Sequence, residues 1–124
     1  MTLGGQEIIV VDDDMSMSQA IERLLVAAGW RVRSFASAEE LLASGASADA
    51  AVLIFDIQLP GMSGLELQRH LAAGGTVTPV IFITAQDRPN TRDRARQSGA
   101  AAYFTKPFAG RELIQAIRQH LPAA

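Results

Sequence analysis

The sequence predicts an α/β domain in which helices cover both faces of a five-stranded parallel sheet. Short apolar runs alternate with segments of helical periodicity along the 124 residues, which is typical of consecutive strand–helix–strand units. Four of the runs are apolar enough for strands buried on both faces. The run at 31–35 carries two arginines and suits an edge of the sheet. We therefore predict a doubly wound sheet with strand order 2-1-3-4-5.

The first strand and the first helix are expected at residues 7–11 and 15–29. The strand is an apolar run (EIIVV) that leads into three aspartates, and the helix places its apolar side chains on one face. Ser16, with Gln19 three residues later, has the spacing of a capping box, and Gly29 is a typical C-terminal stop.

A short helix is expected between the second and third strands. Residues 31–35 alternate polar and apolar side chains, as an edge strand does. Ser37 and Glu40 have the spacing of a second capping box, and the helix that they open should end near Gly45. Residues 51–56 form the third strand, because they are apolar up to the final aspartate.

The second half of the chain continues this alternation. Turn residues (PGMSG) follow the third strand, a proline precedes the fourth, and the helix after the fourth strand is unusually polar. The expected elements are a helix over about 65–73, a strand over 80–84, a polar helix over about 88–98, a strand within 101–108 and an amphipathic helix over 112–121.

Composition restricts the class of protein. Hydrophobic residues make up 48% of the chain, and its length is common for one folded domain, so we expect a single domain over residues 1–124. A net charge of −2 argues against nucleic-acid binding through bulk charge. Because the chain has no cysteine, no recognisable signal peptide and no apolar stretch long enough to span a membrane, it is expected to be soluble and cytoplasmic.

Polar side chains stand where the predicted buried strands end. Parallel strands bring their carboxyl ends to one edge of the sheet, and ligands bind there, at the switch point between the first and third strands. The side chains that should converge at this edge are Asp12 and Asp13 after the first strand, Asp56 after the third, Thr84 after the fourth and Lys106 after the fifth.

Clustered carboxylates repel one another unless a cation neutralises them. Oxygen donors without histidine or cysteine favour a hard cation, Mg²⁺ above all, with Mn²⁺ as an alternative. Together with Lys106, such an ion would attract a dianionic group such as phosphate, and a carboxylate can itself be phosphorylated. Asp56 is the predicted nucleophile, because it stands alone on the central strand. A single strand-end aspartate is ordinarily a helix cap, and we expect Asp14 to be either such a cap or a solvated neighbour of the site. Capping does not explain the whole set.

Four segments resemble, in order and spacing, the receiver domain of bacterial two-component response regulators: VVDDD, FDIQLPGMSGLEL, VIFITA and YFTKPF. The resemblance covers about residues 6–121 and implies a flavodoxin-like receiver fold. It implies that Asp56 takes a phosphoryl group from a sensor histidine kinase or a phosphotransfer protein. It also implies a signalling domain rather than an enzyme, with slow self-dephosphorylation at most.

The resemblance further implies roles for individual residues. Gln58 and Gln86 occupy positions where side chains vary in the family and influence the loss of phosphate. The implied Mg²⁺ ligands are Asp12, Asp13, Asp56 and the backbone carbonyl of Gln58; the implied phosphoryl-binding residues are Thr84, Ala85 and Lys106; the implied switch residues are Thr84 and Tyr103; and Pro107 would follow a cis peptide bond.

The expected output surface consists of the fourth helix, the fifth strand and the fifth helix. The fourth helix offers the sheet only the small side chains of Thr91, Ala95 and Ser98, so it should be displaced easily. Movement of Thr84 toward a phosphoryl oxygen would vacate space for Tyr103 and remodel this surface, which would then dock a partner. A phosphorylation-dependent homodimer and an output in transcription are both compatible with the resemblance. Direct binding to nucleic acid or to a membrane is not expected.

Two other functions use similar elements. A phosphatase of the haloacid-dehalogenase type also has an aspartyl nucleophile, but it carries a second acid two residues later, where this chain has Gln58. A flavin-binding module on the same fold would need a phosphate-cradling loop after the first strand, where the three aspartates would repel phosphate.

Overall fold

The computed structural model describes residues 7–121, and the N-terminal segment in which we expect no signal peptide lies outside the described residues. All of its strand pairings are parallel, and the order is β2-β1-β3-β4-β5, as the sequence predicts. The strands are β1 (Glu7–Val11), β2 (Arg31–Phe35), β3 (Ala50–Asp56), β4 (Val80–Thr84) and β5 (Ala102–Thr105).

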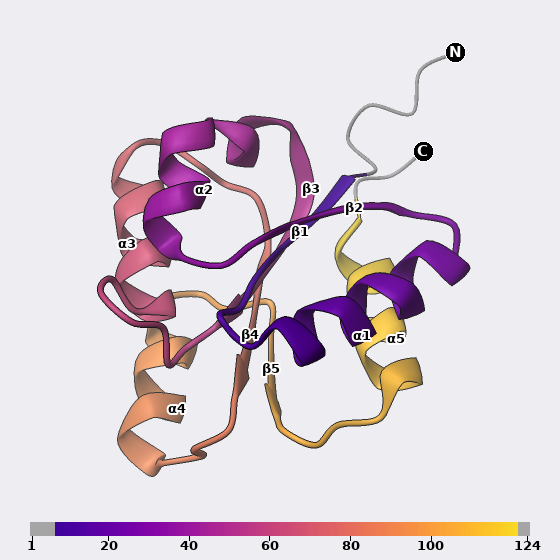
Figure 1. Cartoon of the computed structure of the whole chain (residues 1–124). Helices are drawn as coiled ribbons and strands as arrows, with labels where there is room; N and C mark the ends of the chain where they lie inside the picture. Colours follow the sequence, from indigo (N-terminus) through magenta and orange to yellow (C-terminus); the bar gives the residue numbers. More distant parts are fainter. Residues whose placement is uncertain (1–6, 122–124) are drawn as a thin grey trace.

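Helices cover both faces of the sheet. In Figure 1, α1 and α5 lie on one side of the strands, and α2, α3 and α4 lie on the other. Within the described residues, no helix is both long and apolar enough to cross a membrane. The helices are α1 (Met15–Ala27), α2 (Ala38–Ser44), α3 (Gly64–Ala73), α4 (Pro89–Gln97) and α5 (Gly110–His120).

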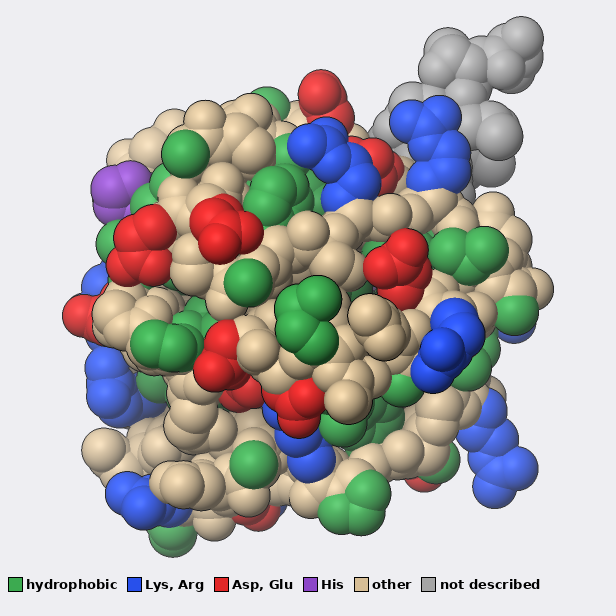
Figure 2. Space-filling view, viewed as in Figure 1, with side chains coloured by type: hydrophobic (Ala, Val, Ile, Leu, Met, Phe, Trp, Pro, Cys, Tyr) green, Lys and Arg blue, Asp and Glu red, His purple; other side chains and the backbone are tan. Residues whose placement is uncertain are grey.

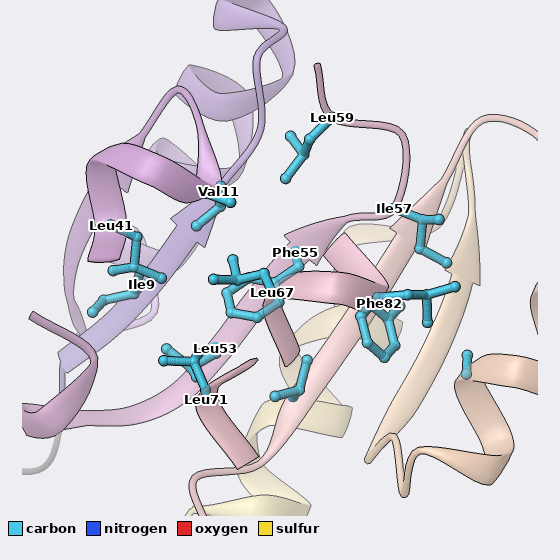
Figure 3. Close-up of a cluster of buried hydrophobic side chains, with 14 of the residues drawn as sticks. Ile9, Val11, Leu41, Leu53, Phe55, Ile57, Leu59, Leu67, Leu71 and Phe82 are labelled. Carbon is cyan, nitrogen blue, oxygen red and sulfur yellow. The ribbon is translucent and has the colours of Figure 1, made fainter. Parts of the chain in front are cut away.

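The sheet separates two hydrophobic cores, because successive side chains of a strand point to opposite faces. Ile9 and Val11 of β1 pack with Phe55 and Phe82 against α2 and α3, in the core shown in Figure 3. The intervening residues of each strand point the other way, so Ile8 packs against α1 and α5 in the second core. The central strands are therefore apolar along most of their length, which is the pattern that made them predictable.

The N-terminal cap of α1 differs in part from the prediction. Asp14, not Ser16, caps α1, because its carboxylate accepts hydrogen bonds from the backbone amides of Ser16 and Met17. The predicted capping box of Ser16 and Gln19 is therefore wrong: the helix already begins at Met15, so its free amides lie within reach of the preceding aspartate. Asp14 itself is a cap, one of the two roles that we expected for it.

The second predicted capping box is half formed. The Ser37 hydroxyl accepts from the Glu40 amide, but the Glu40 carboxylate accepts from Ala36 instead of returning to Ser37. A complete capping box, which the sequence analysis missed, opens α3 through Ser63 and Glu66.

The predicted helix ends are close to those observed. Gly29 follows α1 with φ +104°, a left-handed conformation that favours glycine. The helix α2 ends at Ser44, directly before Gly45, as predicted. A single 3₁₀ turn at Ala46–Asp49, not foreseen from the sequence, then leads into β3, which begins one residue earlier than expected.

A glycine allows α3 to pack closely against the end of β3. The amide of Gly64 donates to the carbonyl of Ile57, and a Cβ atom at Gly64 would lie 2.3 Å from the carbonyl oxygen of Asp56. The obstructing atoms are backbone and cannot rotate away. The first turn of α3 therefore helps to define the position of Asp56.

Substitution Gly64→Ala should lower the free energy of unfolding by about 1–3 kcal/mol, because the added methyl group overpacks the junction of β3 and α3. Urea denaturation followed through the fluorescence of Trp30, the only tryptophan and a buried one, measures this change. Gly74→Ala is the matched control: its Cβ would meet nothing closer than 3.5 Å at a negative φ. Equal effects of the two substitutions would contradict this account of Gly64.

Candidate functional site

The polar strand-end residues converge at the carboxyl edge of the sheet. Asp12, Asp13 and Asp56 each offer a carboxylate oxygen, and these oxygens lie within 4.8 Å of one another. The ammonium group of Lys106 lies 3.2 Å from Asp12 Oδ2 and 3.0 Å from Asp56 Oδ2. In Figure 2, acidic side chains gather near the start of α1 with a basic side chain beside them. Four of the five residues singled out from the sequence thus form one cluster.

Lys106 joins the two buried carboxylates. Burial alone would lower the pKa of this lysine, but its hydrogen bond to Asp56 and the negative charges of Asp12 and Asp56 raise it above the ordinary value. The lysine is therefore charged at neutral pH. Its backbone amide also donates to the carbonyl of Thr84, and its peptide bond to Pro107 is cis.

Asp12 is a buried carboxylate whose pKa is raised well above its ordinary value. Its side chain is 2% exposed, and one oxygen accepts the backbone amide of Asp14. Burial raises its pKa from 3.8 to about 6; the charge of Asp56 adds to the rise, while the Asp14 amide and Lys106 oppose it. The ionised form of Asp12 is therefore disfavoured, chiefly by burial, despite its contact with Lys106.

The donor set suits a hard divalent cation. Asp13 is exposed and turned toward the same point as the two buried carboxylates, so an ion could be bound from the solvent side. Within the described residues, this cluster contains only oxygen donors, which favours Mg²⁺ or Mn²⁺ over metals that prefer nitrogen or sulfur. The residues present therefore fit the ion that the sequence predicts.

Asp56 is held through both of its carboxylate oxygens. It is 6% exposed at the end of the central strand β3. Its Oδ2 accepts from Lys106, and its Oδ1 accepts from the backbone amide of Gln58 at 2.9 Å. These contacts orient a carboxylate whose surroundings are otherwise negative.

Thr84 is completely buried, and its hydroxyl forms hydrogen bonds with residues other than Asp56. Its hydroxyl donates to Gln58 Oε1 at 2.6 Å, with the Gln86 carbonyl at 3.0 Å as a second acceptor. The same hydroxyl oxygen accepts from the Gln86 amide. The neighbouring Ala85 is exposed at the mouth of the site.

Tyr103 is partly buried on β5 and faces α4. Its hydroxyl lies 3.3 Å from Asp87 Oδ1, and the guanidinium of Arg92 lies 5.6 Å from the ring centroid. Arg92 also pairs with Asp87. Burial and the charge of Asp87 raise the pKa of Tyr103, so its hydroxyl keeps the proton that it donates.

Two of these contacts were missed from the sequence. The side-chain bond from Thr84 to Gln58 joins the ends of different strands, and no spacing along the chain indicates it. Asp87 and Arg92 are separated by five residues across a helix start, which resembles an ordinary solvated charge pair. Only their shared contact with Tyr103 distinguishes them.

Comparison with known proteins shows the family of this chain. The model of the response regulator receiver domain family matches residues 8–118. The chain is 38% identical over 117 residues to the response regulator protein TmoT of Ectopseudomonas mendocina, covering 94% of this chain and 53% of that protein. It is 41% identical over 113 residues to the C4-dicarboxylate transport transcriptional regulatory protein DctD of Rhizobium meliloti, covering 90% of this chain and 24% of that protein.

Solved structures share the fold. The response regulator StyR superposes with a TM-score of 0.85 at 38% identity, over 93% of this chain and 58% of that one. The chemotaxis protein CheY4 of Vibrio cholerae superposes with a TM-score of 0.84 at 27% identity, over 93% of this chain and 98% of that one. The chain spans about half the length of TmoT and of other curated relatives such as nodulation protein W. With its strand order, its acidic edge and these matches, the chain belongs to the response regulator receiver domain family.

Proposed function

We propose that Asp56 is the phosphoacceptor of this receiver domain. The proposal rests on one observation above all: the Asp56 carboxylate ends the central strand, is held by Lys106 and the Gln58 amide, and lies within 4.8 Å of the other two acids. A sensor histidine kinase or a phosphotransfer protein would supply the phosphoryl group. One Asp56 oxygen attacks phosphorus as the bond from phosphorus to the imidazole nitrogen breaks, and the imidazole leaves with the electron pair.

The protein's own groups have distinct roles in this transfer. Asp12, Asp13, Asp56 and the backbone carbonyl of Gln58 would hold Mg²⁺ or Mn²⁺, which when bound neutralises negative charge at the reacting phosphoryl group. Lys106, already in contact with Asp56, would bind a phosphoryl oxygen. Thr84 would donate its hydroxyl to another phosphoryl oxygen, and the small Ala85 leaves room beside it. No further catalytic activity is proposed beyond slow self-dephosphorylation.

The surface beside the site suits a protein donor. Within the described residues, an apolar depression lies between α1 and the loop after β5, and it is lined by Met17, Ala20, Leu24, Pro107 and Phe108 among others. One of its lining residues, Pro107, directly follows Lys106 in the chain, so a donor bound there would approach the carboxyl edge of the sheet. We place this exchange in the cytoplasm, since a chain without cysteine suits a reducing compartment.

Phosphorylation would be transmitted to the surface formed by α4, β5 and α5. The helix α4 has one buried residue, Ala95, so little apolar contact anchors it. Thr84 and Tyr103 lie on neighbouring strands, with the loop to α4 between them in the chain. We propose that this surface docks a partner or a second copy. We also propose that residues 1–124 form a single domain that controls a transcriptional output, as DctD does according to its name as a transcriptional regulatory protein.

Acetyl phosphate with Mg²⁺ should add one phosphoryl group to the wild-type chain, because a small donor can replace the protein donor when the acceptor and the metal ligands are preorganised. Intact-mass measurement detects the addition, and Asp56→Asn should abolish it. Asp14→Asn is the matched control, since that residue caps α1 and should leave labelling intact. Undiminished labelling of the Asp56→Asn variant would refute the assignment.

The metal-free stability should fall as pH rises through the range set by Asp12. Its pKa is about 6 in the folded state against 3.8 ordinarily, so between these values the folded state keeps a proton that the unfolded state has lost. Stability is therefore greatest below the lower value and is lost as pH rises through the upper one. In EDTA at about pH 7.5, Asp12→Asn should raise the free energy of unfolding by about 1–3 kcal/mol, and at about pH 4 the gain should vanish.

Thermal denaturation across this pH range, with and without Mg²⁺, tests the expectation. Mg²⁺ should stabilise the wild type by mass action and Asp12→Asn much less. Asp13→Asn is the control in EDTA, because its carboxylate is exposed and should affect metal-free stability less. A pH-independent difference between wild type and Asp12→Asn would exclude the proposed origin of the effect.

Beryllofluoride with Mg²⁺ should change amide hydrogen exchange across residues 86–105, because the weakly anchored α4 lies between the responding residues Thr84 and Tyr103. Exchange in α2, on the other side of α3 from this surface, should stay constant as an internal reference. Asp56→Asn should show no change anywhere. Changes confined to the loops around Asp56 would contradict a switch at the α4–β5–α5 surface.

A further inference from the structure

Gln58 touches both the proposed phosphoacceptor and the proposed phosphoryl ligand. Its backbone amide donates to Asp56 Oδ1 at 2.9 Å, and its side-chain carbonyl accepts from the Thr84 hydroxyl at 2.6 Å. Gln58 itself is exposed, whereas Thr84 is 0% exposed. The glutamine side chain thus reaches from the loop after β3 to a hydroxyl that solvent does not touch.

The single donor hydrogen of the Thr84 hydroxyl is already used in a hydrogen bond. A threonine hydroxyl has one hydrogen to donate, and in this structure its nearest acceptor is Gln58 Oε1, with the Gln86 carbonyl more distant. The Gln86 amide occupies the oxygen as an acceptor. A phosphoryl oxygen on Asp56 can receive this hydrogen only when Gln58 and Gln86 release it.

We propose that Gln58 is a positioning residue that acts through Thr84: its side-chain carbonyl competes with the phosphoryl group for the Thr84 hydroxyl and so biases the domain toward its unphosphorylated conformation. This inference rests on the proposed function, since it presupposes a phosphoryl group on Asp56. The glutamine is an internal acceptor whose removal frees Thr84. A side chain of similar length without an acceptor should therefore favour the phosphorylated conformation.

The expected effect on the affinity for beryllofluoride follows from the loss of one neutral hydrogen bond. Such a bond contributes about 1 kcal/mol net, which corresponds to about a fivefold change in an equilibrium constant. Gln58→Met should accordingly tighten the binding of beryllofluoride, in saturating Mg²⁺, by about three- to tenfold. The effect should depend entirely on the hydroxyl of Thr84.

A double-mutant cycle on the full chain tests this dependence. The dissociation constant of beryllofluoride is measured by titration calorimetry for wild type, Gln58→Met, Thr84→Val and the double variant. Valine preserves the shape of the buried threonine and replaces its hydroxyl with a methyl group. Gln19→Met is the matched control, because it makes the same substitution at an exposed position of α1, outside the site. Thermal denaturation of each variant without beryllofluoride verifies folding.

Each outcome decides the inference. Tighter binding by Gln58→Met, no effect of the same change in the Thr84→Val background, and no effect of Gln19→Met support it. An equal effect of Gln58→Met with and without the Thr84 hydroxyl, or no effect at all, overturns it while leaving Asp56 as the phosphoacceptor. Absence of beryllofluoride binding by the wild type would instead overturn the proposed function, and the inference with it.

Discussion

Two carboxylates buried at the ends of neighbouring parallel strands share a single ammonium group, and the site is organised around this imbalance. Asp12 and Asp56 both contact Lys106, which cannot neutralise both of them and the nearby Asp13 as well. Burial raises the pKa of Asp12 and the negative charge of Asp56 raises it further, so keeping Asp12 ionised in this cluster has a free-energy cost. A divalent cation would relieve it, and the combined positive charge would then favour a phosphoryl group. The free-energy cost of the carboxylate cluster without a cation therefore favours the binding of a cation and then of a phosphoryl group.

The strands and their order could be predicted because burial on both faces leaves a continuous apolar signature. Residues Ile81 and Phe82 belong to opposite cores yet are equally apolar, which excludes a surface strand. The convergence of Asp12, Asp56 and Lys106 could be predicted for the same reason, since the order of parallel strands determines which ends meet. Element boundaries shifted by one or two residues, as they generally do.

Features that depend on local geometry escaped prediction. The sequence offers both Asp14 and Ser16 as caps of α1, and it is the start of the helix at Met15, which the sequence does not determine, that excludes Ser16. The bond from Thr84 to Gln58 depends on the path of a loop that carries no periodic pattern. The pairing of Arg92 with Asp87 under Tyr103 likewise depends on where α4 begins. These contacts are polar and few, so the hydrophobic pattern contains no trace of them.

The three consecutive aspartates have three different environments, so each position in the run has its own role. Asp12 is buried against Lys106, Asp13 faces solvent beside the buried acids, and Asp14 accepts the first amides of α1. A deletion or an insertion here would keep the local composition almost unchanged while moving every carboxylate into its neighbour's place. A sequence alignment that treats the run as an interchangeable acidic patch would therefore misassign its members, and composition alone would not reveal the error.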